Sequence, residues 1–349
     1  MTLLEVDNVS HWYGTKAQRP VLDHVNLSLG TGETVALVGE SGCGKSTLGR
    51  LVAGLTTSTL GTIRHDGREV ARLSRAEHKI WRRSVQLIHQ DPFGALNPGV
   101  RIGSTLGTAL RYHKLVDRAH LEQELLGLLG QVGLEATRDF LHRYPHELSG
   151  GQRQRVCIAR AVSLRPKLVV ADEVTSMLDV SMRVSVLDLL RSFQVQRSIA
   201  FLFISHDLGV VRYFAAGGRV VVMFYGVIVE EGPTEEVIFH PRHPYTALLL
   251  ESIPIPDPTL ARREHGSVDT VPDAGPSPQG CVFSNRCRFA VDRCRTTTPK
   301  LEDDGHGHRA ACFFIERVVR ETTTSAVTDR APDLDSGATC DPSTAGTQA

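Results

Sequence analysis

A glycine-rich segment at residues 39–47 constrains this chain more than any other stretch. The apolar run 34–38 before it predicts a buried strand, and residues 48–55 after it predict a helix that ends near Gly54. A strand, a glycine-rich turn ending in Lys-Ser-Thr and a helix are the full context of a phosphate-binding loop. The glycines let backbone N–H groups face a polyphosphate, and the helix N-terminus adds positive potential. The segment therefore predicts a nucleotide site in an α/β fold.

Two side chains of this loop have expected roles. Lys45 would reach the β- and γ-phosphates of the nucleotide, and Ser46 would place its hydroxyl on Mg²⁺. The candidate nucleotide contacts in the loop are Gly39, Glu40, Ser41, Gly42, Cys43, Gly44, Lys45, Ser46 and Thr47. A chance match in a glycine-rich turn is the alternative, and the strand and helix on either side argue against it.

The composition limits the class of protein. The 349 residues allow about two domains, and 39 basic residues balance 39 acidic ones. With a pI near 7.3 the chain lacks the excess of basic residues that is typical of nucleic-acid-binding proteins, so we expect no nucleic acid partner. The first residues lack the regions of a signal peptide, and the longest apolar stretch, 220–229, is too short to cross a bilayer. We expect a cytoplasmic protein whose seven cysteines do not form a disulfide framework.

The segments before the loop predict antiparallel strands, because residues 4–9 and 21–29 alternate apolar and polar side chains. Tyr13 lies in the connection between these two strands. Its aromatic ring can pack on the core or stack on a nucleotide base, and core packing is the commoner use of such a ring. The sequence of this part alone does not decide between them.

Polar residues follow three further apolar runs, 85–88, 168–171 and 199–204, which predict buried strands. These polar residues are Gln90, Asp172, Glu173 and His206. Because ligands gather at the carboxyl ends of strands in an α/β sheet, we expect these side chains to share one edge with the phosphate loop.

The two acids have the more specific chemistry. Asp172 beside a phosphate loop is placed to hold Mg²⁺, and Glu173 is placed to activate a water molecule. Gln90 alone fits a solvated strand cap as well as a magnesium ligand. A single histidine such as His206 is more often structural, and only the shared edge favours a functional role.

Residues 100–141 show helical periodicity and predict a helical insert. The insert ends at Ser149, Gly150, Gly151 and Gln152, before a helix over 152–163 that offers a second N-terminal anion site. A plain Ser-Gly-Gly helix cap is the alternative.

Together these motifs resemble the ATP-binding subunit of an ABC transporter over about residues 3–250. The resemblance assigns the motifs in chain order: Tyr13 (adenine-stacking aromatic), 39–47 (Walker A), Gln90 (Q-loop), 148–152 (signature), Asp172 (Walker B), Glu173 (catalytic glutamate), Asp179 (D-loop) and His206 (switch histidine). Segments 90–92, 96–98 and 242–246 resemble the oligopeptide/dipeptide importer ATPases in particular. Val174 departs from the family, which usually has proline there, and we expect a local change in the turn.

The resemblance implies the fold and the partners. The fold is a P-loop ABC-type nucleotide-binding domain over residues 1–250, with a RecA-like α/β core, an antiparallel β subdomain and a helical subdomain at about 93–163. Two homologous subunits pair head to tail, commonly as a heterodimer of two different chains, so that Ser149 and Gly151 of one cap the ATP bound to the other. Two transmembrane permease subunits hold the chain at the cytoplasmic face of the membrane, and an extracytoplasmic solute-binding protein completes the complex.

The composition changes at residues 251–320, where prolines mark a linker and four cysteines follow. Cys281, Cys287, Cys294 and Cys312 are separated by five, six and seventeen residues. Four thiols in a small cytosolic segment indicate zinc or an iron–sulfur cluster, and His306 or His308 can complete a mixed zinc site. Four unrelated reduced cysteines are the alternative. The segment resembles the C-terminal extension of peptide importer ATPases, which implies a [4Fe–4S] cluster. Residues 321–349, after this segment, have the composition of a disordered tail.

The leading interpretation is a subunit whose ATP hydrolysis drives import of a peptide-like solute. Oligosaccharide and nickel importers share the same core, and the solute is chosen by other subunits. A soluble ABC ATPase acting on ribosomes or DNA is a more distant alternative, because this chain has a single Walker A motif and no sustained heptads.

Overall fold

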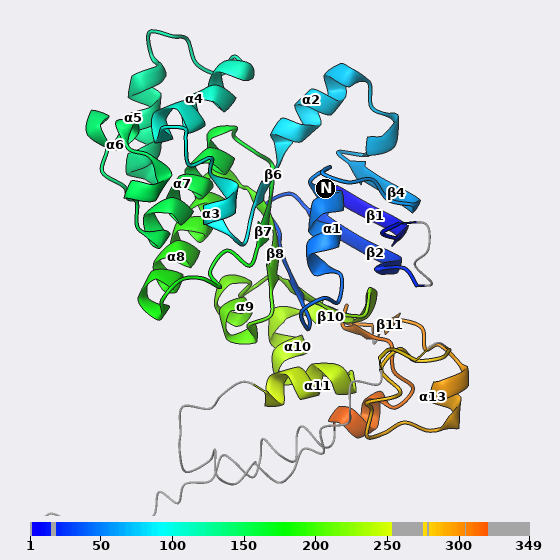
Figure 1. The fold of residues 1–349 in the computed structure, drawn as a ribbon. Helices are drawn as coiled ribbons and strands as arrows, with labels where there is room; N and C mark the ends of the chain where they lie inside the picture. Colours follow the sequence, from blue (N-terminus) through cyan, green and yellow to red (C-terminus); the bar gives the residue numbers. More distant parts are fainter. Residues whose placement is uncertain (1, 15–18, 253–274, 278, 304, 320–349) are drawn as a thin grey trace, which may run out of the picture.

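The computed structural model describes residues 2–14, 19–252, 275–277, 279–303 and 305–319 (Figure 1). The strands are β1 (Thr2–His11), β2 (Leu22–Gly30), β3 (Thr34–Val38), β4 (Leu60–His65), β5 (Arg68–Glu69), β6 (Val85–Ile88), β7 (Leu168–Asp172), β8 (Ala200–Ser205), β9 (Arg219–Phe224), β10 (Val227–Pro233), β11 (Glu302–Asp303) and β12 (Arg309–Ala310). The helices are α1 (Lys45–Val52), α2 (Arg75–Ser84), α3 (Pro92–Ala95), α4 (Ile102–Tyr112), α5 (Leu121–Gln131), α6 (Arg138–His142), α7 (Gly150–Ser163), α8 (Val180–Arg197), α9 (Leu208–Phe214), α10 (Thr234–Phe239), α11 (Pro244–Glu251) and α13 (Asp292–Thr296), with 3-10 turns η1 (Val70–Arg72) and η2 (Pro145–Glu147). The tail predicted at 321–349 and the linker residues 253–274 lie outside the described residues.

Two sheets form the body of the molecule. The larger has the strand order β11-β12-β10-β9-β3-β8-β7-β6, and its strands from β9 to β6 run parallel. The smaller is antiparallel, with the order β2-β1-β4-β5. The pairing of β1 with β2 confirms the antiparallel strands predicted before the phosphate loop. The parallel strands are the buried apolar runs of the sequence, because elements cover both of their faces.

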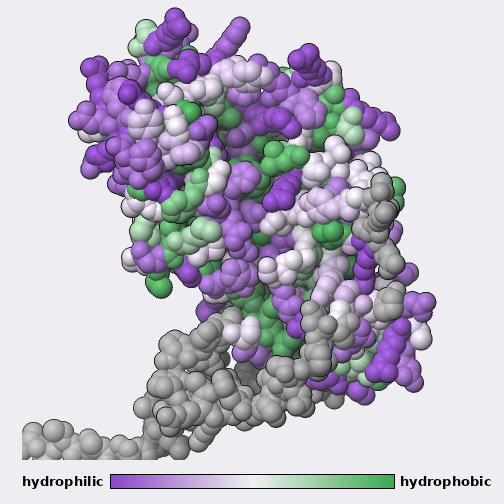
Figure 2. Space-filling view, in the orientation of Figure 1, coloured by the Kyte–Doolittle hydropathy of each residue, from purple (hydrophilic) through white to green (hydrophobic). Residues whose placement is uncertain are grey.

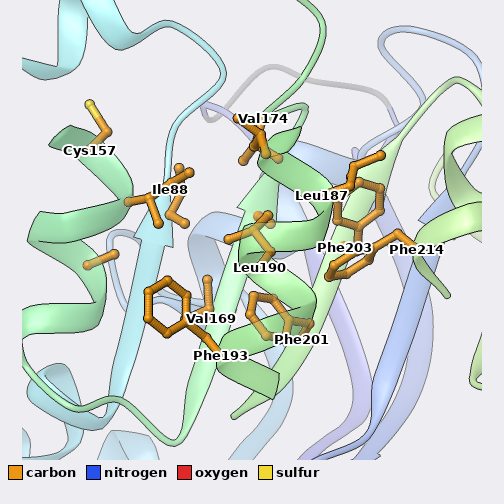
Figure 3. Packing of buried hydrophobic residues seen from close by; sticks show 14 of the residues in the cluster. Ile88, Cys157, Val169, Val174, Leu187, Leu190, Phe193, Phe201, Phe203 and Phe214 are labelled. Carbon is orange, nitrogen blue, oxygen red and sulfur yellow. The ribbon is translucent and has the colours of Figure 1, made fainter. Parts of the chain in front are cut away.

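The alternating side chains of β8 show how the two faces of the larger sheet are covered. Leu202 and Ile204 belong to the core that contains the apolar residues of α1 and the smaller sheet. Phe201 and Phe203 point to the opposite face, where they pack with residues of α8 and with Phe214 of α9 (Figure 3). The rings of Phe203 and Phe214 lie 4.4 Å apart between centroids. The sheet therefore separates α1 from α8 and α9.

The helices α3 to α8 gather on one side of the sheet strands β6–β8, away from α1 (Figure 1). Apolar residues of α4, α5 and α6 join the core that also holds those of α7 and α8. Hydrophilic residues dominate the surface over this group (Figure 2). None of the helices in the described ranges combines the length and apolar character needed to cross a membrane.

The segment after Gln90 begins with the short helix α3, although Pro92 and Pro98 favour an extended or turned backbone there. Asp91 caps this helix, because its carboxylate accepts hydrogen bonds from the backbone N–H groups of Phe93 (2.8 Å) and Gly94 (3.1 Å). Pro92 occupies the first helical turn, where its missing N–H costs nothing and its fixed φ suits a helix.

The cysteine-containing extension is joined to the larger sheet. Its strand β12 pairs with β10, so that Glu230 lies opposite Ala310 and Glu231 opposite Arg309. The fully buried carboxylate of Glu230 accepts hydrogen bonds from the backbone N–H groups of Arg242 and His243. Its Oε1 also lies 2.7 Å from Nε2 of His308, which comes from the extension. The extension thus completes one edge of the main sheet.

Candidate nucleotide-binding site

The phosphate-binding loop connects β3 to α1, as the sequence predicted, although α1 begins at Lys45 and so includes the end of the motif. Gly39 is required sterically, because its φ is +151° and a Cβ there would lie 2.2 Å from the backbone oxygen of Met223. Lys45 is buried, and its Nζ donates hydrogen bonds to the backbone oxygens of Gly39 (2.7 Å) and Glu40 (2.8 Å). The loop therefore folds around a buried cation at the start of a helix.

Tyr13 lies beside this loop. Its hydroxyl is 3.3 Å from Oγ1 of Thr47, and its side chain is half exposed. The ring meets the ring of His11 edge-on, with centroids 4.9 Å apart. The half exposure of this ring argues against the core-packing alternative.

Asp172 ends β7 next to the start of α1. Ser46 donates a hydrogen bond from its hydroxyl to Oδ1 of Asp172 at 3.1 Å. Burial raises the pKa of the Asp172 carboxyl above its ordinary value. A hydroxyl and a carboxylate so close to a phosphate loop are hard oxygen donors of the kind that Mg²⁺ prefers.

Glu173 is held by two side chains from neighbouring strand ends. Gln90 donates a hydrogen bond from Nε2 to Oε2 of Glu173 at 2.7 Å, and Nδ1 of His206 lies 3.1 Å from Oε1. Thus three of the residues predicted to share one sheet edge do meet there. Glu173 has a positive φ of 47°, a conformation rarely adopted by residues other than glycine. Val174 follows it and does not impose the backbone restriction that a proline would place on Glu173.

The segment Ser149–Gln152 lies apart from this group within the chain. Ser149 caps α7: its hydroxyl accepts a hydrogen bond from the backbone N–H of Gln152 (3.3 Å), while the Gln152 side chain accepts one from the N–H of Ser149 (3.0 Å). Gly151 packs so tightly on α8 that a Cβ would fall 1.4 Å from Cε of Met182. In the described part of the chain, no hydrogen bond joins this segment to residues 39–47.

Asp179 caps the next helix, α8. Its carboxylate accepts hydrogen bonds from the backbone N–H of Met182 (2.9 Å) and from the hydroxyl of Ser181 (2.8 Å). These hydrogen bonds lower the pKa of Asp179. Asp179 is thus placed by local capping and makes no described hydrogen bond to the phosphate loop.

Sequence reasoning missed two residues that contact the loop from the C-terminal side. The backbone N–H of Glu40 donates a hydrogen bond to the hydroxyl of Tyr245 at 2.8 Å. Arg286 binds both carboxylate oxygens of Glu40, at 2.9 and 2.8 Å. These pairs are 205 and 246 residues apart, so no local pattern could have indicated them.

The four cysteines of the extension line one small cavity. They are Cys281, Cys287, Cys294 and Cys312. Burial raises the pKa of Cys287 to about 12 and that of Cys312 to about 11. His308, which the sequence left open as a ligand of a mixed zinc site, does not line this cavity, and its Nε2 pairs with the carboxylate of Glu230. Within the described ranges, no three His, Cys, Asp or Glu side chains are grouped so that they could hold a metal ion.

The fold and the site define a P-loop ATP-binding cassette, and comparisons with known proteins agree with this class. A family model described as ABC transporter matches residues 22–176, and one described as the oligopeptide/dipeptide transporter C-terminal region matches residues 229–294. The chain therefore belongs to the ABC transporter ATPase family, in the group with the oligopeptide/dipeptide transporter C-terminal region.

Curated relatives extend over nearly the whole chain. A putative peptide import ATP-binding protein of Brucella ovis is 43% identical over 312 residues, covering 89% of this chain and 97% of its own. The oligopeptide transport ATP-binding protein OppF of Escherichia coli is 40% identical over 310 residues, covering 87% of this chain and 90% of its own.

Solved structures agree on the cassette. The cbiO1 subunit of an ABC transporter complex from Clostridium perfringens is similar with a TM-score of 0.59 and 25% identity, over 68% of this chain and 90% of that one. A dimeric bacterial ABC transporter cassette is similar with a TM-score of 0.60 and 27% identity, over 66% of this chain and 99% of that one.

Proposed function

We propose that this chain is the ATP-hydrolysing subunit that energises an importer of oligopeptides or dipeptides. The observation that carries the proposal is the Glu173 carboxylate, held between Gln90 and His206 at the strand ends beside the phosphate loop. The match to the oligopeptide/dipeptide C-terminal region and the names of the relatives support a peptide as the transported solute.

In this proposal one chain supplies most of the ATP contacts. Tyr13 stacks on the adenine, the backbone N–H groups of residues 39–47 bind the phosphates, and Lys45 reaches the β- and γ-phosphates. The side chains that hold Mg²⁺ are those of Ser46, Gln90 and Asp172. Held there, Mg²⁺ would neutralise the charge that develops on the phosphates.

Hydrolysis then depends on the group around Glu173. Glu173 accepts a proton from water as the water oxygen bonds to the γ-phosphorus and the bond to the β-γ bridging oxygen breaks. Gln90 fixes the orientation of the carboxylate through its 2.7 Å hydrogen bond. His206 contacts the γ-phosphate. Positioning and neutralisation of charge supply most of the catalysis in such reactions.

The proposal also places the partners. A second, homologous ATPase subunit caps the ATP bound to this chain with its own signature segment. In return, the signature segment of this chain, Ser149, Gly150, Gly151 and Gln152, caps the ATP of the partner. The turn at Asp179 lies at the same interface. Two permease subunits contact residues 90–98 and the helical insert, where Phe93 is 56% exposed. The chain is thereby held at the cytoplasmic face of the membrane, and an extracytoplasmic solute-binding protein delivers the peptide.

Reconstitution of the complex tests this function. The chain, its partner ATPase and the permeases would be placed in proteoliposomes with the solute-binding protein, and ATP hydrolysis would be measured with peptides, oligosaccharides or Ni²⁺. We expect peptides to stimulate hydrolysis and to accumulate inside. Stimulation only by oligosaccharides or Ni²⁺ would contradict a peptide as the transported solute but would agree with the transport role. Stimulation by ribosomes or DNA without permeases would reject the transport role itself.

We further propose that Cys281, Cys287, Cys294 and Cys312 together hold one [4Fe–4S] cluster with a structural role. Support comes from their shared cavity and from the all-thiol donor set, which suits iron–sulfur clusters. Four Cys thiolates are the usual ligands of such a cluster, and these four residues would supply them. The sequence offered four arginines, Arg286, Arg288, Arg293 and Arg295, to offset the negative charge of a thiolate-bound cluster. Arg286 and Arg288 pair with Glu40 and Glu251 instead, which leaves this role to Arg293 and Arg295.

Anaerobic purification tests the cluster. We expect brown protein with iron and sulfide in comparable amounts, and replacement of any one of the four cysteines by serine should bleach it. Such variants should keep most of their nucleotide binding, because the thiols are not among the proposed ATP contacts. Colourless protein with stoichiometric zinc would show that the four cysteines hold zinc. Well-folded protein without metal would reject both the cluster and the zinc site.

A further inference from the structure

The cysteine-containing extension reaches the phosphate-binding loop directly. Arg286 precedes Cys287 in the chain and binds both carboxylate oxygens of Glu40, the second residue of the loop. The two side chains are 20% and 38% exposed, so this bidentate pair is partly shielded from solvent. Bidentate arginine–carboxylate pairs fix geometry as well as charge.

A rigid aromatic support holds Arg286 in this position. Its guanidinium lies over the rings of Phe224 (5.6 Å) and Phe283 (5.8 Å), which belong to the main sheet and to the extension. These two rings lie 5.2 Å apart, and both pack on the buried ring of Tyr245. Because the Tyr245 hydroxyl accepts the N–H of Glu40, the same support fixes the backbone and the side chain of one loop residue.

Glu40 is linked to the centre of the loop. Its backbone oxygen accepts a hydrogen bond from Nζ of Lys45 at 2.8 Å. Its carboxylate adds a negative charge to a loop that the proposed function fills with a polyphosphate. Without a cation beside it, this carboxylate would repel the phosphates and would be free to draw the loop away from its position.

We propose that Arg286 is a positioning residue for ATP, through which the C-terminal extension sets the affinity of the phosphate-binding loop. Arg286 neutralises Glu40 and holds it in place, and Glu40 in turn helps to orient Lys45. The inference rests on the proposed ATP site. It also predicts that nucleotide binding changes the stability of the extension, because coupling between two sites is reciprocal.

The test compares ATP dissociation constants of full-length variants. Arg286→Met keeps the side-chain packing on the two rings and removes the charge. We expect ATP to bind about three- to tenfold more weakly, as for the loss of about one kcal/mol from a partly shielded ion pair. Turnover at saturating ATP in the complex should change little. Arg286→Lys should recover part of the affinity, and adding Glu40→Gln to Arg286→Met should restore most of it.

Arg288→Met is the matched control, because Arg288 lies two residues away and pairs with Glu251 at 3.7 Å, where both side chains are 55% exposed. It should leave ATP binding unchanged. Equal ATP affinities of the Arg286→Met and Arg288→Met variants would overturn the inference. It would also be overturned if the variant with both Arg286→Met and Glu40→Gln bound ATP no more tightly than Arg286→Met alone. Failure of the natural chain to bind ATP would instead overturn the proposed function.

Hydrogen exchange in the extension gives a second readout if Arg286→Met does not fold. In the full-length protein as purified, ATP should change the rate of backbone amide exchange in residues 281–294, as followed by peptide mass spectrometry. Glu40→Gln should abolish this effect of ATP. An exchange rate indifferent to ATP in the natural chain that binds ATP would contradict the coupling.

Discussion

Replacing Glu173 by glutamine should lower ATP turnover of the assembled complex by at least about a hundredfold, because an amide cannot accept the proton of the attacking water. ATP binding should stay within about twofold, since the amide has the shape of the carboxylate and removes no phosphate contact. The remaining amide oxygen can still accept the hydrogen bond from Gln90. The measurements are ATP hydrolysis and equilibrium ATP binding, and the variant should accumulate as an ATP-bound dimer.

Glu5→Gln is the control for this substitution, because Glu5 lies in the antiparallel sheet, is 50% exposed and pairs only loosely with Arg64, at 3.4 Å. It should change neither hydrolysis nor binding. Near-normal turnover in the Glu173→Gln complex would reject Glu173 as the base. Loss of ATP binding would mean that the carboxylate serves the nucleotide itself.

Replacing Ser149 by arginine should block hydrolysis in the complex, again by at least about a hundredfold. The signature segment is proposed to cap the ATP of the partner subunit, and an arginine side chain would fill that space. In the described part of the chain, Ser149 makes no hydrogen bond to residues 39–47. The isolated chain should therefore bind ATP as before, within about twofold.

Loss of a helix cap must be separated from this effect, because Ser149→Arg also removes the cap of α7, worth about 1 kcal/mol. Ser74→Arg is a matched control: Ser74 caps α2 with the same kind of capping box, and its hydroxyl accepts a hydrogen bond of the same 3.3 Å length from the N–H of Glu77. It should lower thermal stability similarly and leave hydrolysis intact. If Ser149→Arg weakened ATP binding by the isolated chain, the capping of a partner's ATP would be wrong.

Short-range patterns were enough to predict most elements and the residues at the strand ends. The runs 34–38, 85–88 and 168–171 became β3, β6 and β7 because elements on both faces of a parallel sheet require continuous apolar strands. Helix boundaries were less exact. The helix predicted over 48–55 is α1, which begins at Lys45, and the helix predicted over 152–163 is α7, which begins at Gly150.

The sequence by itself determined the phosphate loop and the two acids at the end of β7, because a glycine turn and a strand end are specified by neighbouring residues. The tertiary structure alone decided that Gln90 and His206 share the carboxylate of Glu173, and that β12 pairs with β10. It also decided that Arg286 reaches Glu40 across 246 residues. Such contacts depend on which edges and side chains are left to pair once the core is packed, and neither periodicity nor spacing along the chain records that choice.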